Sequence, residues 1–182
     1  DTDGRLYMRR SSNQGLAWGA PIRIGEGFNG RSYLDPTLTF ANGQGYLVVN
    51  AMVGSTRDLY LFKIDSALNI TPPSRITADT DNNEKPQVAV TTDGKVHVSY
   101  VLNSSPAQLM LITSDNDGES FHLPERIDDA NTTPETRQLF SSFAESNTMV
   151  ADGKRLYIGY GLYEQGDANL YLAWRPDSET AF

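Results

Sequence analysis

The sequence predicts an all-β fold, a β-propeller built of four-stranded antiparallel blades, with about three to four blades present as a partial or open ring. Three observations predict it: a repeat of 50 to 61 residues, paired strand-like runs joined by Gly-containing turns, and a proline-led run that ends each repeat. The repeat is clearest from Leu6, Leu59, Leu109 and Leu170, which are spaced by 53 (59 − 6), 50 (109 − 59) and 61 (170 − 109) residues. Periods of this length are typical of propellers and arrays.

Two strand-like runs precede the leucine of each full repeat. The first opens at Pro36, Pro86 or Asn147, each 23 residues before its leucine (59 − 36, 109 − 86, 170 − 147). A turn containing Asn-Gly or Asp-Gly follows, and then a second apolar run at residues 46–49, 96–100 and 156–160. Short apolar runs joined by such turns favour β-hairpins. A third strand is expected from the leucine onward.

The fourth strand of each repeat is predicted from Pro-x-Arg-Ile, which occurs at residues 21–24, 73–76 and 124–127. Proline is tolerated at the start of a strand or on a sheet edge, so this run is expected to be a short edge strand. Its arginine is expected to point outward into solvent. Between the third and fourth repeats, residues 128–145 lack strand character, and a short helix or turn is expected at residues 134–140.

These repeats divide the chain, residues 1–182, into segments of one propeller. Residues 1–30 are expected to end a first blade, 35–80 and 86–130 to form two complete blades, and 146–182 to form a blade without its last strand. Such a segment cannot close a ring and leaves a strand edge unpaired. The remaining blades are therefore expected from a longer parent chain or from a second copy.

Composition excludes several classes of partner and site. The formal net charge of −8 and the isoelectric point near 4.7 argue against binding to nucleic acid or to anionic membrane surfaces. The chain has no cysteine, so neither a disulfide nor a thiolate site is available. No apolar run approaches the length of a membrane span, and no N-terminal signal segment is recognisable.

The turn after the third strand carries the most specific motif. It reads Ser-x-Asn-x-Gly followed by an aromatic residue, and its two full copies use Ser11, Asn13, Gly15 and Trp18, and Ser114, Asn116, Gly118, Ser120 and Phe121. Ser and Asn side chains can accept hydrogen bonds from turn amides, Gly supplies a positive φ, and the aromatic ring fills the gap between sheets. The copy at residues 64–71 is degenerate, and the last copy keeps only Asp177 and Phe182.

This motif resembles the Asp box of the BNR-repeat, or sialidase-like, β-propeller family, with Asn where the family usually has Asp. The resemblance implies a propeller that meets glycans, in an extracellular, cell-surface or periplasmic location. It also implies that the box is a structural turn, remote from the functional face. Function is then expected in the loops between second and third strands and in the crossings between blades, of which 128–145 is the longest.

Sialidase-like enzymes bind the substrate carboxylate with an arginine cluster, and use an Asp as acid/base and a Tyr assisted by a Glu as nucleophile. Guanidinium groups suit carboxylates, and acidic groups are needed around a glycosidic bond. By residue type and loop position, the resemblance implies substrate-binding candidates Arg31, Arg57 and Arg137, and catalytic candidates Asp35, Tyr163 and Glu164. The family's Arg-Ile-Pro motif is not in this chain. Solvated loop charges are the alternative interpretation.

No metal or cofactor site is predicted. Asp79, Asp81 and Asn83 have the opening spacing of a calcium loop, but Glu84 stands where the Gly is needed and no closing Glu follows. A polar turn fits this segment better than calcium. The two histidines, His97 and His122, lie in different parts of one repeat and support neither a metal cluster nor a Ser-His-Asp arrangement.

The leading hypothesis is a non-catalytic carbohydrate-binding or scaffold domain. Two alternatives stay open. One is part of a sialidase-like exo-glycoside hydrolase, so whether the chain is an enzyme is undecided at this point. The other is a protein-interaction propeller without a sugar site.

Overall fold

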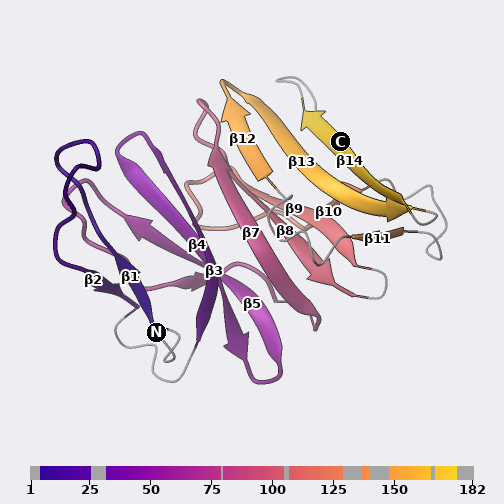
Figure 1. Ribbon diagram of the computed structural model, residues 1–182, viewed down its shortest axis with the longest axis horizontal. Coiled ribbons are helices and arrows are strands. Elements are labelled where there is room, and N and C mark those ends of the chain that lie inside the picture. Colours follow the sequence, from indigo (N-terminus) through magenta and orange to yellow (C-terminus); the bar gives the residue numbers. More distant parts are fainter. Residues whose placement is uncertain are drawn as a thin grey trace.

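The structure is a computed structural model and describes residues 5–25, 32–78, 80–104, 107–128, 137–139, 148–164 and 167–175. The strands of these residues form antiparallel sheets, and no helix occurs among them. Figure 1 shows the sheets side by side in chain order, from the N-terminal strands to β14. The all-β prediction is confirmed. Within the described ranges there is also no helix long and apolar enough to cross a membrane.

Each sheet corresponds to one predicted blade. The first blade holds β1 (Leu6–Met8) and β2 (Ile22–Ile24); the second holds β3 (Tyr33–Ala41), β4 (Gln44–Val53), β5 (Thr56–Ile64) and β6 (Ser74–Arg75). The third holds β7 (Asn82–Val90), β8 (Val96–Asn103), β9 (Gln108–Ser114) and β10 (Glu125–Arg126). The fourth holds β11 (Arg137–Leu139), β12 (Thr148–Asp152), β13 (Arg155–Glu164) and β14 (Asp167–Arg175). In the second and third blades the strands pair in sequence order, as the repeat predicts.

The fourth blade differs from the expectation in one respect. Residues 137–139 form a strand, β11, where a helix or turn was expected. β11 pairs with residues 162–164 of β13 and β12 pairs with residues 155–159, while β14 pairs along the opposite edge. Together β11 and β12 therefore take the place that a single first strand has in the second and third blades.

The first strands of the second and third blades begin earlier than predicted, because their prolines do not start the strands. The register shifts between Leu34 and Thr37 and between Glu84 and Gln87. Pro36 thus lies inside a β-bulge, another position where a strand accepts a residue without an N–H group. The third-blade strand β7 likewise begins at Asn82, so Asn83, expected in a polar turn with Asp79 and Asp81, lies in the strand; Asp79 lies outside the described residues.

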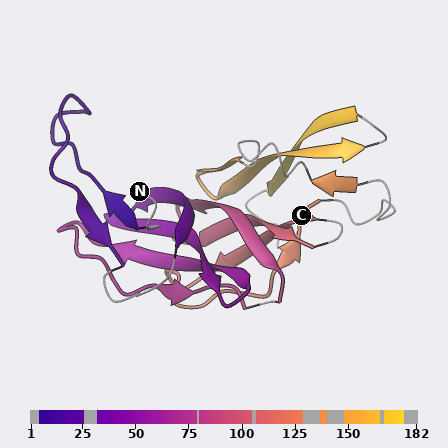
Figure 2. The same cartoon turned by 60° about the horizontal axis from the view of Figure 1, so that its bottom comes forward.

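The core consists of layers between consecutive blades. One cluster joins the second blade to the third, with Val48 and Leu61 on one side and Val98 and Tyr100 on the other. Comparable clusters join the first blade to the second and the third to the fourth. Phe121, the aromatic residue of the third-blade turn, packs against the layer between the second and third blades. Figure 2 shows the blades stacked in a row, with the fourth blade at one end.

The two full copies of the turn motif make the same hydrogen bonds. Ser11 Oγ accepts from the N–H groups of Asn13 and Gly15, and Asn13 Oδ1 accepts from the N–H of Ala17 at 2.8 Å. In the third blade Ser114 and Asn116 repeat each of these bonds. The side-chain contacts expected from the residue types are therefore present in both turns.

The degenerate turn at residues 64–71 is built differently. Asp65 Oδ1 accepts from the N–H groups of Ala67 and Asn69. Thr71 N–H donates to Lys63, the role that Gly19 and His122 have in the full turns. The turn is therefore one residue shorter, and Thr71 does not stand in the aromatic position that the repeat spacing predicts for it.

The arginines of Pro-x-Arg-Ile were expected to point outward into solvent, and two of them also pair with carboxylates. Arg75 pairs with Asp58 of the neighbouring strand at 2.6 Å, and Arg126 makes a two-point pair with Asp128 at 2.7 and 2.8 Å. Both carboxylates are buried. The Asp128 carboxylate also accepts from the N–H of Leu109 at 3.2 Å, so the fourth strand is fastened to the third. Burial of the carboxylates requires these partners.

Candidate functional site

The candidate residues that the structure describes gather at one end of the blades. We call it the loop end; there the second strand of each blade leads into the third, and Asp35, Arg57 and Glu164 lie close to it in their strands. The opposite end, which we call the turn end, carries the Ser-x-Asn-x-Gly turns. Arg31, Asp177 and Phe182 lie outside the described residues.

Arg57 bridges two blades. Its N–H donates to Asn82 Oδ1 at 3.0 Å, and its carbonyl accepts from Asn83 Nδ2 at 3.2 Å. Its guanidinium Nη1 pairs with Glu84 Oε1 at 2.6 Å. The first strand of the third blade therefore binds both the backbone and the guanidinium group of Arg57. The observed role of this residue is to connect the second and third blades.

Asp35 lies in the β-bulge of β3 and presents an exposed carboxylate. Its φ of +48° is unusual for a residue other than glycine. Its Oδ2 accepts a hydrogen bond from Asn50 Nδ2 at 2.8 Å, and Asn50 is fully buried. Bulges recur beside functional sites because they redirect a side chain, and here the redirected group is a carboxylate.

The fourth blade brings three candidates together. In the β11–β13 ladder Arg137 is opposite Glu164, and Gln138 is opposite Tyr163. The chain separates Arg137 from the other two by more than 25 residues (163 − 137 = 26). Directly opposed residues are nearest cross-strand neighbours, so Arg137 and Glu164 are paired at the loop end of the sheet, and Tyr163 occupies the adjacent, alternating strand position.

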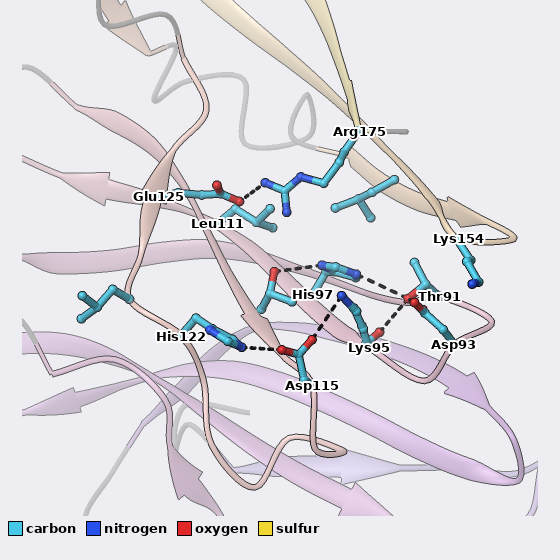
Figure 3. A pocket seen from close by; sticks show the side chains of 13 residues that line it. Thr91, Asp93, Lys95, His97, Leu111, Asp115, His122, Glu125, Lys154 and Arg175 are labelled. Atoms are coloured by element: carbon cyan, nitrogen blue, oxygen red, sulfur yellow. Dashed lines mark hydrogen bonds and ion pairs between the residues drawn. The ribbon is translucent and has the colours of Figure 1, made fainter. Parts of the chain in front are cut away.

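A pocket of about 380 Å³ lies at the turn end, between the third and fourth blades (Figure 3). Lys95 pairs with Asp115 at 3.4 Å, His122 pairs with Asp115 at 2.7 Å, and Arg175 pairs with Glu125. His97 points into the pocket, with Nδ1 3.0 Å from Thr113 Oγ1. The lining thus combines cations and carboxylates that neutralise one another. Sequence reasoning missed this pocket because its residues come from turns and strands of two blades that are far apart in the sequence.

Burial, reinforced by the charge of Arg175, lowers the pKa of His97 to about 4. The imidazole is therefore neutral at pH 7, which suits a side chain that is only 4 % exposed. Within the described part of the chain, no group of three or more His, Cys, Asp and Glu side chains could hold a metal ion.

No family model matches the sequence, and no curated protein matches it. Among solved structures, it is similar to the Hadza microbial sialidase Hz136, with a TM-score of 0.63 and 17% identity over 80% of this chain and 35% of that one. An endo-arabinase from Bacteroides thetaiotaomicron VPI-5482 gives a TM-score of 0.59 and 13% identity, covering 87% and 61%. The family 117 glycoside hydrolase Zg3597 from Zobellia galactanivorans gives 0.58 and 15%, covering 97% and 54%.

These likenesses bear on the fold, because the identities are low. The chain spans about a third of the length of the Hadza sialidase and less than two thirds of the length of the other two proteins. The observed sheets and these structures together show a β-propeller of the kind found in sialidases and other glycoside hydrolases.

Proposed function

We propose that the chain is part of a glycan-binding β-propeller whose sugar-facing site is at the loop end. The observation that carries this proposal is the register of β11 on β13, which sets Arg137 opposite Glu164. An arginine fork suits a sugar carboxylate, and a glutamate accepts hydrogen bonds from sugar hydroxyls. Propeller carbohydrate enzymes among the similar structures support this class of ligand.

The Ser-x-Asn-x-Gly turns support assignment to the BNR, or Asp-box, group of propellers. Two turns 103 residues apart (114 − 11) make the same set of hydrogen bonds from the same residue types. The box has a structural role in this proposal. An extracellular or periplasmic location and a ring completed by further blades or by a second copy are parts of the same proposal.

Hydrolysis of an exo-linked sugar, as in sialidases, is the second candidate function. The specific observation in its favour is the same pairing of Arg137 with Glu164, since it supplies the residue types of a substrate-binding arginine and a catalytic carboxylate. Asp35 is the described carboxylate that would act as acid/base in such a reaction.

Binding of 3′-sialyllactose and of arabinotriose by the 182-residue chain, measured by calorimetry, tests the main proposal. We expect Arg137→Ala to weaken binding by about tenfold, the scale of a charge-assisted hydrogen bond. Arg155→Ala is the matched control, because Arg155 is exposed at the turn end of β13, the strand that carries Glu164. Equal binding by wild type and Arg137→Ala would contradict a site at this place, and binding of neither sugar would favour a protein-interaction propeller.

Release of 4-methylumbelliferone from a sialoside tests the hydrolase alternative. Turnover that is lost in Glu164→Gln and retained in Asp152→Asn, an exposed carboxylate at the turn end, would support it. If the wild type binds sugar but shows no turnover, the binding proposal stands and the hydrolase alternative is rejected.

A further inference from the structure

Position 50 of the second blade departs from the repeat. Asn50 pairs with Leu59 in the β4–β5 ladder, Val101 pairs with Leu109 in the third blade, and Gly161 pairs with Leu170 in the fourth. The three repeat leucines therefore align Asn50 with Val101 and Gly161. The amide occupies a position that is apolar or without a side chain in the other two blades.

The buried amide of Asn50 is unfavourable for stability by itself. Asn50 is 0 % exposed, and its Oδ1 has no hydrogen-bond partner among the described residues. A buried acceptor without a partner loses its hydrogen bonds to water and gains no protein hydrogen bond, which destabilises the folded state. The side chain of Asn50 makes one hydrogen bond that the structure shows, from its Nδ2 to Asp35 Oδ2 at 2.8 Å.

Asp35 is itself held in an unfavourable conformation. Its φ of +48° falls in the left-handed region, where side chains with a Cβ are strained, and Pro36 follows it in the bulge. The corresponding bulge of the third blade has Lys85 at a φ of +54°, so the bulge belongs to the repeat while the carboxylate and its buried donor belong to the second blade. Two unfavourable features thus converge on one exposed carboxylate.

We propose that Asn50 is a positioning residue for Asp35, which it orients to accept hydrogen bonds from the hydroxyl groups of a sugar. This inference rests on the proposed glycan-binding function and deepens it. Asn50 donates to Oδ2 of Asp35, and Asp35 is exposed, so the carboxylate is held at one oxygen while it faces solvent. A carboxylate oriented before binding loses less freedom on contact with a ligand.

The test compares Asn50→Val, which installs the third-blade residue, with Asp35→Asn and the double variant. We expect Asn50→Val and Asp35→Asn each to weaken binding of 3′-sialyllactose or arabinotriose by about tenfold, and the double variant to lose no more than Asp35→Asn. The thermal midpoint of Asn50→Val should equal or exceed that of wild type, because the unpaired acceptor is removed. In Asn50→Val, the NMR couplings that report on χ1 of Asp35 should change from the values of a single rotamer to values averaged over several rotamers.

Each contrary result has a distinct meaning. Unchanged binding in Asn50→Val, with binding lost in Asp35→Asn, overturns the role of Asn50 and leaves the sugar site intact. Unchanged binding in Asp35→Asn removes Asp35 from the site, and absence of binding by the wild type overturns the proposed function together with this inference. Asn50→Leu, close to Asn in shape, serves if Asn50→Val does not fold; failure of both to fold shows that Asn50 is structural and overturns the proposal.

Discussion

The second and fourth blades carry the same leucine pattern on their third strands and bury it to different extents. Leu59 and Leu61 of the second blade are 0 % and 2 % exposed, whereas Leu170 and Leu172 of the fourth are 84% and 65% exposed. The third blade packs over the first pair. Among the described residues nothing packs over the second pair, and Trp174 extends the same exposed row of β14. The repeat thus determines which face of a blade is apolar, and a neighbouring blade determines whether that face is buried.

The two faces of one blade point toward different neighbours. In the second blade Leu47 and Val49 pack toward the first blade, while Tyr46 and Val48 pack toward the third. This alternation follows from the period of two along a strand. A fully buried strand of a propeller is consequently apolar on both faces, which makes its run continuous.

The largest expected effect separates the two classes of leucine. Leu109→Ala should reduce the free energy of unfolding by about 3 kcal/mol, because it removes buried methyl groups and leaves a cavity between the third and fourth blades. Leu170→Ala, at the same repeat position, should change it by less than about 0.5 kcal/mol, as expected for an exposed side chain. Urea denaturation of both variants provides the measurement. Similar losses in the two variants would mean that a neighbour covers the fourth blade in solution.

The second prediction compares the two inter-blade interfaces through equivalent side chains, Tyr46 and His97. Tyr46 donates to Asp117 in the turn of the third blade, whereas His97 faces the pocket toward the fourth. Because folding lowers the pKa of His97 from 6.5 to about 4, the unfolded chain binds more protons below pH 6.5. The contribution of the neutral His97 to the free energy of unfolding is therefore fully present above pH 6.5 and is lost as the pH falls toward 4.

At pH 5 this loss should amount to about 2 kcal/mol relative to pH 7. Urea midpoints at the two pH values, for wild type and His97→Gln, give the contribution of His97 as the difference between the two proteins. His122→Gln is the control, since His122 is exposed at the rim of the same pocket. An identical pH dependence of wild type and His97→Gln would contradict burial of a neutral imidazole.

The smallest expected difference lies between two glycines at equivalent positions of the full turns. Gly15 has a φ of +89° and open space where a Cβ atom would lie, whereas a Cβ on Gly118, at a φ of +78°, would lie 2.6 Å from Leu61 Cδ2 of the second blade. Gly15→Ala should cost about 1–2 kcal/mol from backbone strain alone. Gly118→Ala should cost about 1 kcal/mol more, from overpacking at the interface. Thermal or urea denaturation measures both changes in stability. Equal losses of stability in the two variants would mean that the Leu61 side chain moves aside at no cost.

Much of the fold could be predicted from the sequence because its signals are local. The leucine spacing, the Gly-containing turns and Pro-x-Arg-Ile each describe a few consecutive residues, and they predicted the strand order of the second and third blades. Pro36 misled the prediction of a strand start, since a bulge and a strand end both accept a missing N–H group. The strand β11 was missed because three residues without alternation give no periodic signal.

The candidate site could be predicted only as a set of residue types. Arg57 was selected as a loop arginine, and its role as an inter-blade connection depends on Glu84, 27 residues later. Asn50 gave no signal in the sequence because a lone Asn near the end of a strand is ordinary. Its significance follows from the register that aligns it with Val101 and Gly161.

By itself, the sequence determined the blade pattern, the apolar faces and the turns, because hydrogen bonds within a blade join residues that the repeat spaces regularly. Only the folded chain shows which of those faces are buried, which arginines are paired, that Arg137 is opposite Glu164 in the strand register, and that Asn50 donates to Asp35. Such contacts depend on how blades stack and on where bulges shift the register. A single-residue change in register moves every following side chain, and no local pattern records it.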